Sequence, residues 1–551
     1  MRSAYHRLID QARNTSWLLL LYLVMVLQVK TGVKVAAIIL FVFLFRKELK
    51  SFDFIKKRFM WFYAGLIVIA LVNLLTQVGD VTVNYLVAAL AGISFWILCI
   101  ATGMIGYLFV KKSDTARLHN TFAILFVINA LFTIGQLISF MIDGGTINPY
   151  TYQGMNQKYF IGTGDLLRGI TYDVSTTNAL LNAMGVIYFL ERRKFHWLLM
   201  CMGVLLLTAS NFTNLILFLI LLLQFVFRSD RNQKSVIVVC LMLFIVFFAR
   251  VSPHNKNYLK YVWQKVTDTK IDTLFPQASP PLLSELEDSV LSEDQRKRKI
   301  AMLFLDSTQV VTMARKTNPS QPKPILTSIA ASPAVVRTKP TIPKPNIHTE
   351  PYQLNRDTSV FRRQLIDFAV AQIPSFDTSQ RNMQKNRYPG KIMAVQQTLT
   401  YLKAHPSKLL MGTGIAKFSS KIAFRATALQ FAGGYPAKYA YINPAFRDNH
   451  LDLYLNYFTK DQQFHSLMNS PDSVYDQLLA EYGLAGFALF LVFFVGYYAK
   501  HLTRRDFALP LLLLIIGAFA IGYWFEQLSI VIVFEMLMFL SMKEGGSKEI
   551  I

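Results

Sequence analysis

The chain has 551 residues, of which 53% are hydrophobic and only 16% are charged. Soluble domains carry roughly a quarter charged residues, so this composition excludes an ordinary soluble enzyme. The formal net charge is +24, from 57 Lys and Arg against 33 Asp and Glu. The apolar residues fall in blocks separated by short charged clusters, a pattern typical of a polytopic membrane protein.

The apolar blocks predict an all-α membrane protein with about twelve transmembrane helices, since a span needs roughly 20 mostly apolar residues. The first block follows Arg2, Arg7 and Arg13, and no small-residue cleavage site comes after it. We therefore interpret it as a retained span and not as a signal peptide. The predicted spans are 17–29, 33–45, 59–75, 83–110, 121–142, 173–190, 197–210, 212–227, 235–249, 484–499, 508–523 and 525–542.

Basic clusters between the spans predict the orientation, because loops rich in Lys and Arg stay in the cytoplasm. The short turns at 76–82, around Asn211 and at Tyr523–Trp524 carry no Lys or Arg. We expect both termini to be cytoplasmic, with membrane domains at 1–249 and 484–551. Between the ninth and tenth spans, 250–483 forms one large periplasmic loop. The basic clusters are 46–58, 111–117, 191–196, 228–234, 500–505 and the tail from Lys543.

The outer loop is basic, with 30 Lys and Arg against 18 Asp and Glu between Arg250 and Glu481. This charge fits an anionic partner such as a lipid headgroup, a lipid diphosphate or an acidic glycan, and equally a solvated loop. The stretch 316–351 is rich in Pro, Lys, Thr and Ser, so we predict a disordered insert there. We expect 352–483 to fold against the membrane.

Several enzyme signatures are absent from the sequence. There is no GxxxxGK[ST] loop, HExxH, paired CxxC or GxSxG, and GTGIAKF at 412–418 lacks the Rossmann spacing. Cys99, Cys201 and Cys240 lie inside apolar blocks, so we expect them to be packing residues. We therefore expect no metal site, no cofactor and no nucleic-acid partner.

Charged residues in or beside the spans are the first functional candidates. Glu526 and Glu535 in the last predicted span indicate either an intramembrane polar site or structural hydrogen bonds between helices. Arg168 lies at the outer end of the sixth span, close to Asp173. An arginine there fits bidentate binding of phosphate oxygens, and equally an interfacial side chain reaching lipid headgroups.

Three blocks carry a resemblance to a known family. They are RGITYDVSTTN at 168–178, with TASNFTNL following at 208–215; AHPSKLLMGTGIAKF at 404–418; and SPDSVYDQLLAEYGLAG at 470–486. In this order, and with the expected topology, the sequence resembles the O-antigen ligase/polymerase superfamily. The resemblance implies a glycosyltransferase of the bacterial inner membrane that needs no metal. Such an enzyme transfers a glycan from undecaprenyl diphosphate to another lipid-linked glycan, to lipid A-core or to a protein hydroxyl.

The resemblance also implies roles for individual residues. Arg168, with Arg387 or Lys391, would bind the diphosphate, and Asp472 or His450 would deprotonate the acceptor hydroxyl. The sequence departs from the family pattern where the expected histidine falls on Asp472 and where the arginine of the 208–215 turn falls on Asn211. The arginine expected before the His405-Pro406 block falls on or near Lys391.

Two other classes compete with the enzyme. A transporter or flippase of lipid-linked sugars would share the span count, but the chain carries an outsized outer loop and shows no pseudo-repeated halves with broken helices. A non-catalytic protein of envelope assembly is the third alternative, and the missing histidine favours it.

Overall fold

A computed structural model describes residues 13–53, 57–76, 82–144, 167–248, 389–427, 435–451, 453–454, 470–502 and 506–547. Within these ranges the chain is mostly helical and contains no strand. Arg387, Asp165, the insert 316–351 and the rest of 249–388 lie outside the described residues.

Four of the described helical segments are long and apolar enough to cross a membrane. They are Arg58–Thr76, which contains α5 (Trp61–Thr76), α6 (Val83–Lys112), α7 (Thr115–Gly144), and Val474–Lys500. The last of these comprises α20 (Val474–Leu489), a π-helical stretch at Phe490–Val495 and α21 (Gly496–Lys500). These segments confirm the membrane-protein character expected from composition.

Shorter apolar helices occupy most of the other predicted blocks. They are below the length that a straight span requires, so their length alone does not make them spans. Their bounds are α2 (Trp17–Leu27), α3 (Thr31–Leu44), α9 (Phe195–Leu207), α10 (Asn211–Phe227) and α22 (Ala508–Ala518). Two further helices, α8 (Ser175–Glu191) and α11 (Arg231–Val246), lie in the sixth and ninth predicted blocks.

The helix that contains the tenth predicted span, 484–499, starts at Val474 after the N-cap residue Ser473 and is broken at Gly483. One predicted boundary is wrong. The block 525–542 is not one helix: α23 (Trp524–Gln527) ends at Leu528, whose φ of 54° is left-handed, and α24 (Ile530–Glu544) follows. Glu526 therefore lies in a short helix before the last long one.

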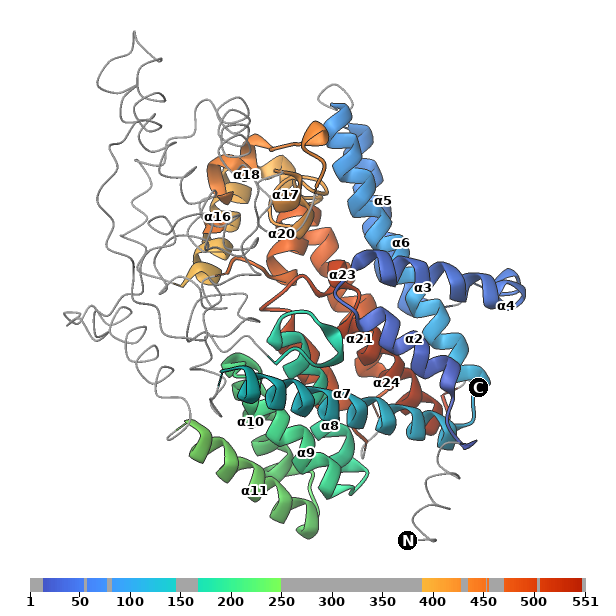
Figure 1. Ribbon diagram of the computed structural model, residues 1–551. Helices are drawn as coiled ribbons and strands as arrows, with labels where there is room; N and C mark the ends of the chain where they lie inside the picture. The colour runs from blue at the N-terminus through green and yellow to red at the C-terminus, as the bar shows by residue number, and fades with distance from the viewer. Residues whose placement is uncertain are drawn as a thin grey trace, which may run out of the picture.

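Figure 1 shows α16 (Gly390–Ala404), α17 (Lys421–Ala426) and α18 (Pro444–Asn449) together at one end of the molecule, beside α20. Helices α7 to α11 form the opposite part, and α24 lies beside α7 and α8. The core is continuous, because buried side chains from α2, α6, α8, α20 and α24 belong to one cluster. All three cysteines are buried and free, as the sequence predicts.

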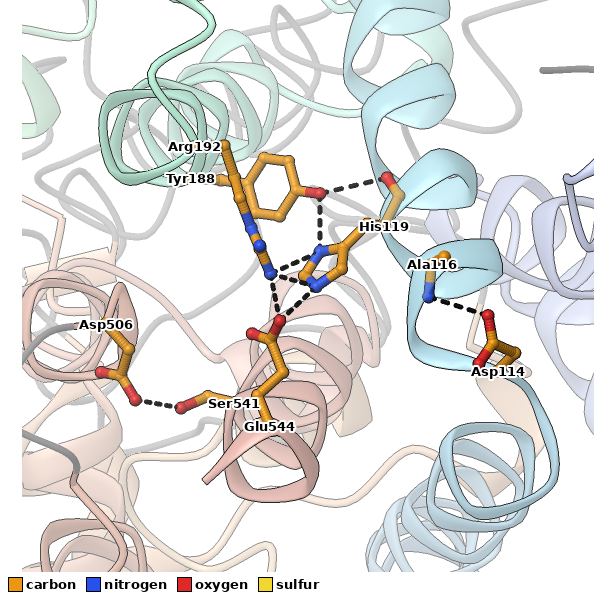
Figure 2. A network of polar contacts seen from close by, with 8 residues as sticks. All are labelled: Asp114, Ala116, His119, Tyr188, Arg192, Asp506, Ser541 and Glu544. Atoms are coloured by element: carbon orange, nitrogen blue, oxygen red, sulfur yellow. Dashed lines mark hydrogen bonds and ion pairs between the residues drawn. The ribbon is translucent and has the colours of Figure 1, made fainter. Parts of the chain in front are cut away.

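Charged residues near the ends of several helices form a network of polar contacts, away from α16 to α18. Glu544 at the end of α24 contacts Arg192 at 2.5 Å and His119 Nε2 at 2.7 Å, and Tyr188 donates to the His119 carbonyl at 3.1 Å (Figure 2). Lys543 donates to the Val110 carbonyl at the end of α6 at 2.8 Å, and so satisfies a helix C-terminus.

The same network joins the remaining basic clusters. Lys112 forms an ion pair with Glu48. Arg193 pairs with Asp230 at 2.5 Å. The Arg228 guanidinium donates to the carbonyl of Asp506, just after the cluster at 500–505, at 3.2 Å. The segments that carry the basic clusters are thus linked to one another by direct contacts at one end of the protein.

Candidate functional site

The site forms where the three sequence blocks meet, and a break in α20 makes the meeting possible. Gly483 has φ 66° and ψ −163°, which is not helical. The break frees the amides of Leu484 and Ala485, which donate to the carbonyls of Leu409 and Leu410 at 2.9 Å each. Gly483 thus interrupts the helix where its backbone pairs with the second block, AHPSKLLMGTGIAKF.

The loop that leads from Leu410 to α17 is held by the last residues before the break. Thr413 donates its amide to the Ala480 carbonyl at 2.9 Å, and Gly414 donates to the Glu481 carbonyl at 3.1 Å. Gly412 has φ 77°, and a Cβ there would lie 2.3 Å from the Glu481 carbonyl carbon. Only glycine fits such a close approach of two backbones.

The Glu481 carboxylate completes this attachment. It is fully buried and accepts four backbone hydrogen bonds from the loop. Four amide donors compensate the cost of burying a carboxylate, which would be large for an unpaired one. The donors are Ala416 to Oε2 at 3.0 Å, and Phe418 at 3.0 Å with Ser419 and Ser420 at 3.1 Å to Oε1.

Helix α17 begins immediately after this loop and carries two cations on one face. Ser420 is its N-cap and accepts from the Ala423 amide at 3.0 Å. Lys421 and Arg425 are four residues apart, so their side chains are neighbours. Each lies in electrostatic range of Asp173. Burial and their mutual repulsion lower the pKa of Lys421, and burial lowers the pKa of Arg425.

A third cation comes from a distant part of the chain. Lys34 of α3 is only 3% exposed, and its ammonium donates to the carbonyl of Gln527 just after α23. It lies in electrostatic range of Asp173, Lys421 and Arg425. The sequence contained this signal, because Lys34 stands at the start of an apolar block where a lysine is costly. The prediction treated it as a flanking residue and missed it.

Arg168 lies on the segment that carries Asp173 into the site. Its amide and that of Gly169 donate to Gln136 Oε1 of α7, at 3.1 and 2.9 Å. Its carbonyl accepts from the Thr171 hydroxyl at 2.6 Å. The Nη2 atom of its guanidinium is buried and has no hydrogen-bond partner. The backbone of Arg168 is thus held by hydrogen bonds, while Nη2 of its guanidinium has no hydrogen-bond partner.

Asp472 and Lys391 lie together, as the sequence suggested for a shared site. Lys391 donates to the backbone carbonyl of Asp472 at 2.5 Å. Burial raises the pKa of the Asp472 carboxyl, while the charges of Lys391 and Lys421 oppose that shift. Burial lowers the pKa of Lys391 to about 8, against the opposing effect of Asp472 and Asp476.

His450, the other predicted base, is enclosed. It is 0% exposed, and its ring lies 5.3 Å from that of Phe418. Its Nε2 is 3.6 Å from a carboxylate oxygen of Asp476, which is also fully buried. Burial lowers the pKa of His450 to about 3, so the ring is neutral at pH 7. It is close to the site but does not open onto it.

The two predicted intramembrane glutamates have different surroundings. Glu535 of α24 accepts from the Tyr63 hydroxyl of α5 at 2.7 Å, which is the structural hydrogen bond between helices that the sequence left open. Glu526 accepts from Gln477 of α20 at 2.7 Å through Oε1. Its Oε2 is buried without a partner, and it lies in electrostatic range of Lys421 and Arg425. Glu526 therefore belongs to the site and Glu535 does not.

The unpaired atoms indicate what chemistry would fit here. At α17, Arg425 Nε is a buried donor without a partner, and Glu526 Oε2 is a buried acceptor without one; Arg168 Nη2, on the segment that carries Asp173, is a further such donor. Leaving such groups unpaired costs about 1–3 kcal/mol each, which a bound molecule would recover. A ligand with anionic oxygens would accept hydrogen bonds from the unpaired donors, and a ligand hydroxyl group would donate one to the unpaired acceptor. A sugar phosphate has this chemistry.

Among the residues that the structure describes, no group of three or more His, Cys, Asp or Glu side chains is arranged to hold a metal ion. The chain matches no protein-family model, no curated protein and no solved structure.

Proposed function

We propose that the protein is a membrane glycosyltransferase of the O-antigen ligase/polymerase type, acting on a lipid-diphosphate-linked glycan. The observation that carries the proposal is the meeting of all three resembling blocks at one buried charged site. Asp173 of the first block lies in range of Lys421, directly beyond the second. The second block is in turn held by Glu481 of the third.

The topology that accompanies this proposal has about twelve spans, with both termini in the cytoplasm and the site on the periplasmic face of the bacterial inner membrane. The direct contacts among the basic clusters support it, because positively charged loops on one face fit the positive-inside rule. A membrane-impermeant maleimide tests it. We expect labelling of Lys403→Cys in intact cells, and of Lys112→Cys only after permeabilisation.

In the proposed reaction, Arg168, Lys391, Lys421 and Arg425 bind the diphosphate, and their charges stabilise it as it leaves. The acceptor hydroxyl oxygen forms a bond to the anomeric carbon while the bond from that carbon to the diphosphate oxygen breaks. The hydroxyl proton passes to the Asp472 carboxylate. We favour Asp472 over His450 as the base, because His450 is enclosed and Asp472 is half-buried beside two of the cations.

A transporter of lipid-linked sugars is the second candidate, and one observation favours it. The helices at the site are broken, at Gly483 in α20 and at Leu528 between α23 and α24. Discontinuous helices at a charged site are common in transporters. Against the transporter, the sequence shows no pseudo-repeated halves that would carry such breaks in pairs, and the large outer loop expected from the sequence favours the enzyme.

The test is the surface and lipid-linked glycan profile of a deletion strain, restored with wild-type, Arg168→Ala or Asp472→Asn protein. Lys403→Ala is the matched control, because Lys403 is an exposed lysine on the helix that carries Lys391. We expect the control to restore the profile and both site variants to fail at equal expression. Single repeats on the acceptor indicate a polymerase, and long chains retained on the lipid carrier indicate a ligase. An unchanged profile in the deletion strain would refute the proposed glycosyltransferase activity.

A further inference from the structure

The Glu481 carboxylate makes four of the hydrogen bonds that attach the segment before α17 to α20. Helix α17 has six residues, too few to be stable without external support. The segment 416–420 before it includes Ala416, whose φ of 61° is left-handed. Such a conformation persists when the surrounding contacts enforce it, and here the Glu481 carboxylate provides four of those contacts.

The same contacts determine where the cations of α17 lie. Lys421 follows directly after Ser420, whose amide is the last of the four donors to Glu481. A shift of that amide therefore also moves Lys421. Arg425, which lies one helical turn after Lys421 in α17, moves with it. Electrostatic stabilisation of a bound anion is sensitive to displacements of this size, because charge–charge energy in a buried site depends on the distance between the charges.

We propose that Glu481 is a positioning residue: its carboxylate fixes the start of α17 so that Lys421 and Arg425 converge on the site that binds the anionic donor. The inference rests on the proposed function only in assigning a diphosphate to these two cations. Glu481 itself does not face that ligand, since its carboxylate is fully buried against the backbone of the loop.

Glutamine cannot replace Glu481 in this role, although its size is the same. Oε1 accepts three amides and Oε2 accepts the amide of Ala416. An amide side chain can keep the oxygen with three partners only by pointing its NH2 group at the Ala416 amide, where two donors then face each other. The other three bonds also lose the negative charge that strengthens them.

The experiment measures binding of inorganic pyrophosphate to the full-length purified protein by calorimetry, in a double-mutant cycle of Glu481→Gln and Lys421→Ala. Glu191→Gln, at the far end of α8, is the matched Glu-to-Gln control. We expect Lys421→Ala to weaken binding by about tenfold or more, from one lost charge interaction, and Glu481→Gln to weaken it by displacing Lys421 and Arg425. We expect the double variant to lose less than the sum of the two single losses, because Glu481 acts in part through Lys421.

Hydrogen exchange at the amides of 416–420 supplies a second readout, which should accelerate in Glu481→Gln and not in Lys421→Ala. Additive losses in the cycle, or unchanged exchange, would overturn the positioning role while leaving the anion site intact. Unchanged binding in Lys421→Ala would overturn the anion site itself. Should Glu481→Gln not fold, Glu481→Asp keeps the charge on a shorter side chain, and the same cycle is then run with it.

Discussion

Replacing Gly483 by alanine tests whether the break in α20 is required by the fold. The residue has φ 66° and ψ −163°, a region that is essentially restricted to glycine. A Cβ there would lie 2.5 Å from the Leu410 carbonyl oxygen and 2.6 Å from the Gly412 amide nitrogen. Both are backbone atoms, so neither can move aside without shifting the loop.

The expected cost follows from these contacts. Strain in this backbone region costs about 1–3 kcal/mol. Displacing the loop weakens the two bonds from Leu484 and Ala485, at about 0.5–1.5 kcal/mol each. We therefore expect Gly483→Ala to destabilise the protein by about 2–6 kcal/mol, a size reached by few single substitutions.

The measurement is the apparent melting temperature in detergent and the rate of hydrogen exchange at 409–420. Gly203→Ala is the matched control, because Gly203 lies inside α9 and nothing lies within 4 Å of the position of its Cβ. Alanine there should be neutral or stabilising by up to about 1 kcal/mol. The reasoning fails if Gly483→Ala is as stable as Gly203→Ala, since a helix without the break would then be accessible.

The other predictions concern protonation and surface charge. His450 has a pKa of about 3 in the fold against 6.5 when free, so stability present above pH 6.5 should fall as the pH is lowered. The loss should reach about 2 kcal/mol at pH 5 and disappear in His450→Phe, as read from melting temperatures across pH. Glu544→Gln should cost less than about 1 kcal/mol, a loss that diminishes in high salt, because its partner Arg192 is partly exposed. Pyrophosphate binding should weaken as the pH rises through about 8, where Lys391 loses its charge, and Lys391→Arg should keep binding constant to higher pH.

Local patterns in the sequence predicted the helices well, because an apolar block can be recognised from its own residues, without knowing which helices pack against it. The predicted span 83–110, for example, lies within α6 (Val83–Lys112). The boundary at Leu528 was not predictable, because a left-handed leucine is held by packing and leaves no signal in composition.

The candidate site was only partly predictable for a similar reason. Arg168 was selected as a charge beside an apolar block, whereas Lys391 and Asp472 were selected through the resemblance of the sequence blocks to the family. Glu481 looked like one residue of a helix, and its function as an acceptor for four amides depends on a loop more than sixty positions away. His450 was a misleading candidate. Its charged neighbours in the sequence, RDNH at 447–450, suggested a polar site, but its ring is buried and packs against Phe418.

The charge balance of the site links ligand binding to protonation. Lys34, Lys391, Lys421 and Arg425 lie in range of Asp173, Asp472 or Glu526, and burial favours the neutral form of Lys391 and of Lys421 by lowering the pKa of each. A diphosphate reverses this preference, because its charge favours protonated lysines. Lys391 has a pKa of about 8, so roughly half of it is uncharged at pH 8, and binding must then draw protons from solution. Calorimetry of pyrophosphate binding at pH 8 in two buffers of different ionisation enthalpy should show about half a proton more taken up by the wild type than by Lys391→Arg, since any proton that pyrophosphate itself loses cancels in this comparison. Equal proton uptake in the two proteins would mean that the anion does not bind beside Lys391.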